Sequence, residues 1–447
     1  MHSKSKKYPV ITQGYGVFIE PNGGYIFPYE EINGVKRAHS SCENLNVQAC
    51  AILAHCTGSE TVEDIVHALE DIFEDIPPDL FAQVESFLEE AVEKEYIYCS
   101  DEPVQMQGII QGSITYYTPT QVLIETTAKC NLDCKHCLLS AGEPLPDELT
   151  VSEFIPLIER LYEIGVKRVH LSGGEVLTKE GWEKMADFCI ERFYSGILTN
   201  GILITEEIAD KLTSYKEVHI SLYGRDAETH EKITGVPGSF ERAVKGITLL
   251  TERDMYVGAS VLMVPFNLHQ LEDMVKLAIS LKCKIMRVGI ISPVGRAYTG
   301  EWELTEEQKA LLDTKMSELK EKYKDEITVQ WEEEPRKEHR CGAGYTRWVV
   351  ISNGDVYPCA IFRVPIGNLK RDDPVDILNL PAVQFLQELK APHDALCGDC
   401  HYLYACGECH GQAFAHYFKV DHCGWAQQFE KAPEPFKSAI WNKMNRK

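Results

Sequence analysis

Short apolar runs alternate with amphipathic helix patterns through the middle of the chain, and this alternation constrains the fold more than any other feature. The apolar runs are Val122 to Glu125, Val166 to Leu171, Gly196 to Thr199, Glu217 to Leu222, Gly258 to Val264 and Met286 to Ile291. The helix patterns begin near Thr150, Lys179, Thr205, Ser239 and Leu268. Strands that alternate with helices predict a parallel sheet, and six such repeats predict a partial (β/α)6 TIM-like barrel of the α/β class. We place this barrel at residues 119–300 and expect its ligands at the carboxyl ends of the strands.

Three closely spaced cysteines, Cys130, Cys134 and Cys137, follow the first apolar run with the spacing C-x3-C-x2-C. This spacing lets three thiolates wrap one corner of a four-iron cluster, and the fourth iron is then free to chelate a small molecule. The alternative is a zinc knuckle with His136 as the fourth ligand. Zinc sites prefer paired C-x2-C or Cys/His motifs, and no matching second pair lies nearby, so the sequence favours iron and sulfur.

Composition narrows the partners and the compartment. Among 447 residues, 45 Lys+Arg stand against 68 Asp+Glu, and the net charge of -23 argues against a nucleic-acid partner. A basic or amphipathic peptide is a more compatible partner. The chain begins without an apolar signal-peptide region and has no segment long enough to span a membrane, so we expect no membrane association and a cytoplasmic location.

Cysteine usage supports a reducing compartment, in which sixteen cysteines are expected to be thiols or metal ligands rather than disulfides. Ten of them fall in tight spacings. The other six are expected to be buried thiols, because free cysteine behaves as a small apolar residue. These six are Cys42, Cys50, Cys56, Cys99, Cys189 and Cys283.

The cysteine loop, together with the run Gly173-Gly174-Glu175 after the second predicted strand, resembles the radical S-adenosylmethionine (SAM) superfamily. In that family the free iron binds SAM, and one-electron reduction cleaves SAM to methionine and a 5′-deoxyadenosyl radical that abstracts hydrogen from an unactivated carbon. The resemblance implies that the three cysteines are catalytic as cluster ligands, and that an external electron donor is needed. Family members usually carry an aromatic residue at the position of His136.

The resemblance also implies a set of SAM contacts at the carboxyl ends of the strands. Gly173 and Gly174 would let the backbone approach the methionine moiety, and Glu175 would accept from its ammonium group. The other implied contacts are Asn200, Ser221 for the ribose, Arg242 for the SAM carboxylate, and Ile291 for the adenine. Each has an ordinary alternative, such as a turn glycine, a capping asparagine or a surface arginine. The family often has an acidic residue where this chain has Tyr223.

Seven further cysteines follow a helix that opens with the capping box Thr305 to Gln308 and runs to about Lys324. They are Cys341, Cys359, Cys397, Cys400, Cys406, Cys409 and Cys423. Their spacing resembles the SPASM extension of peptide-modifying radical SAM enzymes, which implies two auxiliary 4Fe-4S clusters within residues 301–447. The family usually has C-x3-C where this chain has Cys406 to Cys409. A zinc ribbon is the alternative.

Seven cysteines cannot supply two clusters that need four ligands each. By resemblance, Cys397, Cys400, Cys406 and Cys423 hold the outer auxiliary cluster, and Cys341, Cys359 and Cys409 hold the inner one. The inner cluster would then have an open iron, and the protein would carry three 4Fe-4S clusters in all. A histidine beside a cysteine is an alternative fourth ligand. The candidates are His339, His401, His410 and His422.

Residues 14–100 predict a small winged-helix-like domain with two or three strands and three helices. A hairpin signal around Asn22-Gly23 comes first, helices follow from Asn46, from the cap Thr61 and after Pro78, and a strand at Tyr96 to Tyr98 closes the unit. Its acidic second half disfavours DNA. It resembles the PqqD-like element that captures a leader peptide as an added strand. The alternative is a structural appendage, and residues 101–118 predict a linker with at most a peripheral strand.

Together these resemblances imply a peptide maturase, closest to sactionine synthases of SCIFF-type precursor peptides. Such an enzyme binds a precursor peptide by its leader and joins a cysteine sulfur to a backbone or side-chain carbon, and an open iron suits that role because it binds and deprotonates a thiol. One alternative is another SPASM-type modification, such as formylglycine formation, carbon–carbon crosslinking or decarboxylation. An alternative of another class is a non-catalytic peptide-binding scaffold with structural clusters.

Overall fold

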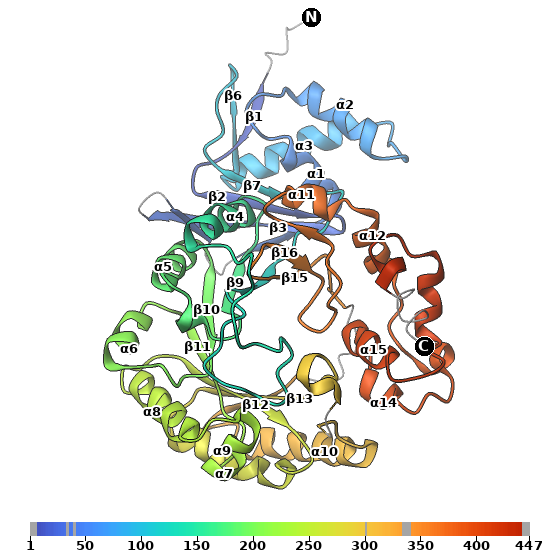
Figure 1. The fold of residues 1–447 in the computed structure, drawn as a ribbon. Coiled ribbons are helices and arrows are strands. Elements are labelled where there is room, and N and C mark those ends of the chain that lie inside the picture. Colours follow the sequence, from blue (N-terminus) through green and yellow to red (C-terminus); the bar gives the residue numbers. More distant parts are fainter. Residues whose placement is uncertain (1–6, 33–34, 39–41, 300–301, 333–340, 440–447) are drawn as a thin grey trace, which may run out of the picture. The chain divides into compact units, whose positions relative to one another are not determined.

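The computed structural model describes residues 7–32, 35–38, 42–299, 302–332 and 341–439 (Figure 1). The chain divides into two compact units. One comprises Met1–Thr118 with Leu161–Val166, and the other comprises Pro119–Arg160 with Lys167–Lys447. Within the described ranges, no helix is both long and apolar enough to cross a lipid bilayer.

All six predicted apolar runs form strands of one sheet in the larger unit. The strands are β8 (Gln121–Glu125), β9 (Arg168–Ser172), β10 (Tyr194–Thr199), β11 (Glu217–Ser221), β12 (Val257–Met263) and β13 (Ile285–Ile290). They lie side by side in chain order, each parallel to the next. The predicted α/β class and partial parallel barrel are therefore confirmed.

Helices connect these strands, and five of them begin near the predicted places. They are α4 (Val151–Glu163), α5 (Trp182–Arg192), α6 (Glu206–Leu212), α7 (Ala227–Thr234), α8 (Ser239–Thr251) and α9 (Leu271–Ser280). Helix α7 was not predicted, although it has ordinary signals: Asp226 caps its start and Gly235, with φ +73°, ends it. In Figure 1, α5, α6, α8 and α9 lie on the outer side of the curved sheet.

Alternating positions along the strands explain how the sheet is stabilised. Val122 and Ile124 on β8, and Val169 and Leu171 on β9, are completely or almost completely buried. Each such aliphatic side chain contributes roughly 1.5–3 kcal/mol relative to an exposed position. The side chains that point to the opposite face of the sheet include polar residues at the strand ends, such as Glu125.

The cysteine-rich extension adds strands to both edges of this sheet, which the sequence did not predict. Strand β14 (Thr328–Trp331) pairs parallel with β13, and β15 (Arg347–Val350) pairs parallel with β8. Two short strands, β16 (Asp355–Tyr357) and β17 (Gly367–Asn368), continue the sheet antiparallel. They are too short to show a periodic pattern.

The other α-helices of the larger unit belong to the cysteine-rich extension. The predicted capping box is present at Thr305 and Gln308, where α10 begins. The helices are α10 (Glu306–Lys322), α11 (Pro374–Leu378), α12 (Pro381–Glu388), α13 (Asp394–Cys397), α14 (Leu403–Cys406), α15 (His410–Tyr417) and the 3-10 helix η4 (Trp425–Lys431).

The smaller unit contains the predicted hairpin and three helices, with more strands than expected. The hairpin is β2 (Tyr15–Glu20) with β3 (Gly23–Ile32), and β4 (Val35–Ala38) and β5 (Glu43–Leu45) pair with β3. The helices are α1 (Val47–Ala54), α2 (Val62–Ile72) and α3 (Leu80–Glu93), and the expected caps at Asn46 and Thr61 are present.

Two strands lie outside the predicted range 14–100. Strand β1 (Tyr8–Ile11) precedes it and pairs antiparallel with β6 (Ile97–Ser100). Strand β7 (Ile109–Gly112) falls in the predicted linker and pairs parallel with β2, as the peripheral strand anticipated there.

The scattered cysteines follow the prediction in part. All sixteen cysteines are free of disulfides, and Cys50, Cys56, Cys189 and Cys283 are buried as expected. The prediction is wrong for Cys42 and Cys99, which are exposed. Cys99 lies on β6, in a two-stranded sheet with β1.

Candidate functional site

The loop that carries Cys130, Cys134 and Cys137 begins where β8 ends, and backbone hydrogen bonds close it into a ring. The Gly142 amide donates to the Ala128 carbonyl, and the Cys130 amide donates to the Gly142 carbonyl, each over 2.9 Å. The sharp turns that bring the sulfurs together are therefore formed by the chain itself.

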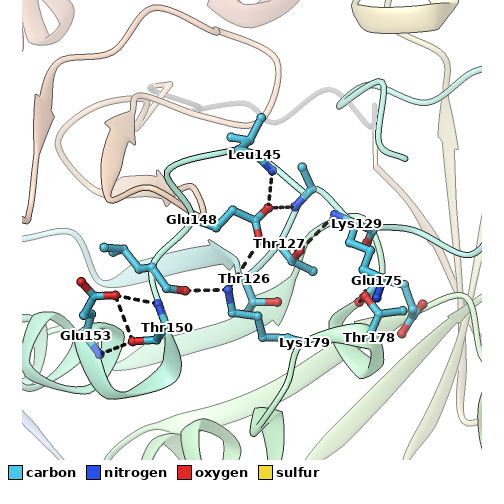
Figure 2. Close-up of polar contacts among 12 residues, drawn as sticks. Thr126, Thr127, Lys129, Leu145, Glu148, Thr150, Glu153, Glu175, Thr178 and Lys179 are labelled. Carbon is cyan, nitrogen blue, oxygen red and sulfur yellow. Dashed lines mark hydrogen bonds and ion pairs between the residues drawn. The ribbon is translucent and has the colours of Figure 1, made fainter. Parts of the chain in front are cut away.

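A buried carboxylate, Glu148, holds the base of this loop (Figure 2). It accepts from the amides of Ala128 and Leu145 over 2.6 and 3.0 Å and from Thr127 Oγ1 over 2.8 Å. Its side chain is 9% exposed, and Lys179 Nζ lies 3.5 Å away. Burial favours the neutral acid, but the hydrogen bonds and Lys179 outweigh it, so the pKa of Glu148 lies below its usual value.

The three thiols of the loop lie close enough to affect one another. Burial, together with the neighbouring Cys130 and Cys137, raises the pKa of Cys134 to about 12. Two sulfurs accept from backbone amides: Cys130 Sγ from Leu132 over 3.5 Å and Cys137 Sγ from Ala141 over 3.3 Å. Three neighbouring thiols, two of which accept from backbone amides, fit an iron–sulfur cluster.

Zinc fits this site less well. A structural zinc ion needs four ligands at about 2.0–2.3 Å. His136, the ligand that a zinc knuckle would use, is buried edge-on against the Tyr223 ring with centroids 4.7 Å apart.

Gly173 and Gly174 lie against the backbone of the cysteine loop. A Cβ on Gly173, whose φ is +137°, would lie 2.5 Å from the Thr127 carbonyl oxygen, and one on Gly174 would lie 2.3 Å from that of Lys129. The Gly174 amide donates to Thr127 and the Glu175 amide to Lys129 over 2.7 and 2.8 Å. Close packing on the loop explains both glycines, whereas their expected approach to SAM stays a prediction.

Glu175 and Asn200 come together beside the loop as the sequence predicted. The Glu175 carboxylate is 1% exposed and accepts from the Asn200 amide and from Thr199 Oγ1, each over 2.7 Å. Asn200 Nδ2 in turn donates to Asn131 Oδ1, in the cysteine loop, over 2.7 Å. Burial raises the pKa of Glu175, and these hydrogen bonds oppose that rise. Contact of either residue with SAM stays a prediction.

Ser221 and Ile291 lie near the loop through Tyr223, which sequence reasoning noted only as a departure from the family. Ser221 ends β11, and its hydrogen bond lowers the pKa of the Tyr223 hydroxyl, which burial and the three loop thiols raise. Ile291 is buried in a cluster with Ile233 that Tyr223 also contacts. The position of Tyr223, two residues after a strand-ending serine, was the signal available.

Arg242 is not brought to the other predicted residues by any contact that the structure shows. It is exposed at the start of α8, where its Nε donates to the Gly238 carbonyl over 3.1 Å. Its assignment to the SAM carboxylate therefore stays a prediction.

A different arginine, Arg296, binds the cysteine loop and was missed. Its Nε donates to the Cys134 carbonyl and its Nη1 to the Ala141 carbonyl, each over 2.8 Å, and its own amide donates to the Cys137 carbonyl over 3.0 Å. Its targets are backbone carbonyls of a distant loop, for which a single sequence holds no pattern.

The cysteines assigned to the outer auxiliary cluster lie near one another. Burial raises the pKa of Cys406, and so do the thiols of Cys400, Cys423, Cys397 and Cys409. Cys409 therefore lies near this group as well, and the division of the cysteines between the two clusters stays a prediction. A hollow of about 420 Å³ lies beside Cys397 and Cys400 and is lined by His401 and His422 as well. These two histidines therefore lie beside the outer group.

The inner cysteines also lie near one another. Burial raises the pKa of Cys359, the Phe362 amide donates to its sulfur over 3.2 Å, and the Cys341 thiol raises its pKa further. A Cβ on Gly411 would lie 3.2 Å from Cys359 Sγ, so the start of α15, directly after Cys409, packs on Cys359. This supports the assignment of Cys409 to the inner group, which stays a prediction.

A fourth inner ligand from the two other histidine candidates stays a prediction. His410 is buried, and its ring stacks on Trp425 with centroids 6.1 Å apart. His339 lies outside the described residues.

The smaller unit has a groove of about 1000 Å³ between β5, α1 and α3. Its floor is apolar, with Ile52, Leu69 and Val84 among the lining side chains. Charged lining residues are all acidic: Glu43, Glu74, Asp75 and Glu90. Lys94, at the end of α3, forms ion pairs with Glu43 and Glu90 at 2.8 and 2.9 Å.

Three family profiles match parts of the chain. The radical SAM superfamily matches residues 124–278, the iron–sulfur cluster-binding domain called SPASM matches 341–401, and coenzyme PQQ synthesis protein D matches 38–97.

Relatives and solved structures extend these matches. The antilisterial bacteriocin subtilosin biosynthesis protein AlbA of Bacillus subtilis (strain 168) is 25% identical over 94% of this chain and 96% of its own length. The mycofactocin maturase MftC of Mycobacterium tuberculosis (strain CDC 1551 / Oshkosh) is 30% identical over 65% of this chain and 78% of its own. The crystal structure of Streptococcus suis SuiB bound to precursor peptide SuiA has a TM-score of 0.62 at 16% identity, covering 91% of this chain and 96% of that one, and so shows a shared fold.

Proposed function

Because this chain belongs to the radical SAM superfamily, as a member with SPASM and PqqD regions, we propose that it installs intramolecular thioether crosslinks in a ribosomally synthesised precursor peptide. Each crosslink would join a cysteine sulfur to a backbone or side-chain carbon. One observation carries the proposal: Cys341 and Cys359 lie together, with α15 packed on Cys359, in a group for which the sequence offers three cysteines. A peptide thiolate supplies the missing fourth sulfur.

The ten clustered cysteines would hold three 4Fe-4S clusters. Cys130, Cys134 and Cys137 hold the first, Cys397, Cys400, Cys406 and Cys423 hold the outer auxiliary cluster, and Cys341, Cys359 and Cys409 hold the inner one. When bound, SAM and the first cluster supply the 5′-deoxyadenosyl radical that takes hydrogen from the acceptor carbon, with electrons from an external donor. We assign the SAM contacts to Gly173, Gly174, Glu175, Asn200, Ser221, Arg242 and Ile291.

The chain's own contribution is to position the first cluster loop. Glu148 accepts hydrogen bonds from backbone amides of that loop, and Arg296 donates hydrogen bonds to its backbone carbonyls. Rigid support of this kind lowers the entropic cost of bringing a reactive group to its target. The loop is then fixed before substrate arrives.

The smaller unit supplies the leader site. Strand β5 pairs with β3 and borders the groove, so an extended peptide can add beside it and place apolar side chains between α1 and α3. The acidic lining suits a basic or amphipathic leader. We assign leader recognition to residues 14–100, a linker to 101–118, the barrel to 119–300 and the SPASM domain to 301–447. We also propose a cytoplasmic location, because exposed thiols such as Cys42 and Cys99 call for a reducing compartment.

Anaerobic reconstitution with iron, sulfide and SAM tests the function. The reconstituted enzyme is incubated with reductant and a cysteine-rich precursor peptide encoded beside the gene, and the peptide is analysed by mass spectrometry. Loss of two hydrogens per crosslink, with formation of 5′-deoxyadenosine, is expected. Loss of carbon dioxide, gain of oxygen, or no cleavage of SAM would contradict the proposal.

Another SPASM-type peptide modification is the second candidate. It is favoured by the mycofactocin maturase MftC, which is 30% identical over 65% of this chain. The mass measurement separates a decarboxylation from a thioether, because the two change the peptide mass by different amounts. A carbon–carbon crosslink also removes two hydrogens, but it leaves the cysteine thiol open to alkylation, whereas a thioether blocks it, so alkylation of the product before mass spectrometry separates these two.

A further inference from the structure

An ion pair, Glu125 with Arg363, joins the segments that carry two of the cysteine groups. Arg363 Nη1 and Nη2 donate to the two carboxylate oxygens of Glu125 over 3.0 and 2.6 Å. Glu125 is 6% exposed, at the end of β8. The two ends of the pair belong to different segments, one leading into the loop of Cys130 and the other following Cys359.

This pair lines a cavity of about 290 Å³ within the larger unit. On one side the cavity is bounded by Leu138 and Leu139, which directly follow Cys137, and on the other by Ile351 and Ser352 of the extension. Its volume is close to the lower end of small-ligand sites, which measure about 300–1,000 Å³. The space suits a short peptide segment.

The ion pair has hydrogen-bonding capacity left over. A guanidinium has five N–H groups, and Arg363 uses two on Glu125 and one, from Nε, on the Ala360 carbonyl at 2.8 Å. Two N–H groups therefore have no acceptor among the residues that the structure describes. Each Glu125 oxygen accepts a single hydrogen bond there, which leaves lone pairs unused. The Arg363 side chain is 19% exposed, so this unused capacity is available to a ligand that enters the cavity the pair lines.

A residue of an extended peptide has the matching groups. Its N–H can donate to Glu125 and its carbonyl can accept from Arg363, whereas the side chain meets the leucine and isoleucine walls. A charge-balanced pair can bind a neutral amide without leaving a buried net charge.

We propose that this cavity is the subsite for the acceptor residue of the precursor peptide, and that Glu125 and Arg363 bind that residue through its main-chain amide groups. The inference rests on the proposed function, since it needs a peptide that reaches the barrel. Under this proposal, the enzyme recognises the acceptor residue by its backbone groups and by the size of its side chain. One enzyme could then modify chemically different residues.

A cycle with a backbone-modified peptide tests the proposal on the full-length reconstituted enzyme. The substrate is the precursor peptide encoded beside the gene, prepared with either the normal amide or an ester at the nitrogen of the mapped acceptor residue. In the wild type, the ester should lower kcat/KM at least tenfold, because it removes the N–H group that donates a hydrogen bond to Glu125. In the E125M/R363M variant, which leaves no buried charge unpaired, the ester should change kcat/KM less than twofold. An equal ester penalty in both enzymes would overturn the proposal.

A second variant guards against loss of folding. R363K retains the charge but not the fork-shaped guanidinium, and it should lower the yield of crosslink per 5′-deoxyadenosine at least tenfold. R347K, at an exposed arginine on β15, is the matched control and should leave this ratio unchanged. Equal ratios in R363K and R347K would contradict the subsite. If the wild type makes no peptide product, the proposed function is refuted. If it makes a product other than a thioether, the amide and ester peptides can still be compared in the wild type and in E125M/R363M.

Discussion

At the scale of single residues, the cysteine loop is held by groups that have little chemistry of their own. Glu148, Arg296 and the glycines of the Gly173-Gly174 pair contact backbone atoms of the loop. Their effect is therefore geometric, and their substitution should act first on the cluster.

Gly174→Ala should destabilise the first cluster. The added Cβ would meet the Lys129 carbonyl oxygen at 2.3 Å, and neither backbone segment can yield without moving the loop. We expect a cost of about 1–3 kcal/mol and loss of the electron paramagnetic resonance signal of the SAM-binding cluster. Gly142→Ala, in the same loop, has no atom within 4 Å of its new Cβ and should retain the signal. Equal signals in the two variants would contradict this account.

Glu148→Ala should also remove that cluster, because it leaves the part-buried amide of Ala128 without an acceptor, at about 1–3 kcal/mol, and releases the exposed Leu145 amide at the base of the loop. Iron analysis after reconstitution should show the loss of about one cluster of the three. The control is Glu153→Ala, which removes an exposed capping carboxylate at Thr150 instead. If both variants bind iron equally, Glu148 does not hold the loop.

His230 should make stability depend on pH. Burial lowers its pKa to about 4, and its neutral Nδ1 accepts from the Tyr223 amide over 3.2 Å. The unfolded chain takes up a proton near pH 6.5, so the stabilisation is complete above that pH and is lost as the pH falls toward 4. Between pH 7 and 5, the apo wild type should lose about 2 kcal/mol more unfolding free energy than His230→Asn, measured in urea. Parallel pH profiles would contradict the assignment.

Residues whose partners are backbone atoms could not be predicted from the sequence. The three loop cysteines, Glu175 and Asn200 were found because their spacing or their place at a strand end is a pattern in one chain. Arg296 was missed because its partners are backbone carbonyls that the fold brings to it. Arg242 was chosen by position alone, and its exposed side chain shows how little a helical arginine reveals.

At the scale of elements, the helices and strands that could be predicted are the ones long enough to show a periodic apolar pattern. The barrel strands and their helices repeat an apolar pattern over many residues, and all six strands formed where expected. Strands β14 to β17 have two to four residues each, so no period could show them. Strands β1 and β7 pair with distant partners, which local sequence does not specify.

The turn between α2 and α3 should determine how charge affects leader binding. Glu74 and Asp75 line the groove there, whereas Glu89 and Glu93 on α3 do not. The double reversal E74K/D75K should weaken binding of a lysine-containing leader peptide about fivefold at low salt, measured by fluorescence anisotropy, and less at high salt. The matched double reversal E89K/E93K should change the affinity less than twofold. Equal effects would mean that the leader does not occupy this groove.

At the scale of the whole molecule, the clustered cysteines all belong to the larger unit. Removing the clusters should therefore loosen that unit selectively. Hydrogen exchange of apo and reconstituted protein should differ in residues 128–142, 356–362 and 394–431. The hairpin of β2 and β3 should exchange at the same rate in both forms, and faster exchange there on cluster removal would contradict this expectation.

The pairing of β15 with β8 has a consequence for how the extension can be altered. Strand β8 leads directly into the cysteine loop, and β15 occupies its free side along four residue pairs. Truncation before β15 would uncover the main-chain amides and carbonyls of β8, and bare strand margins of this kind invite self-association. A chimaera built from two such proteins should therefore be joined downstream of Val350, so that the catalytic half keeps the strand that seals it.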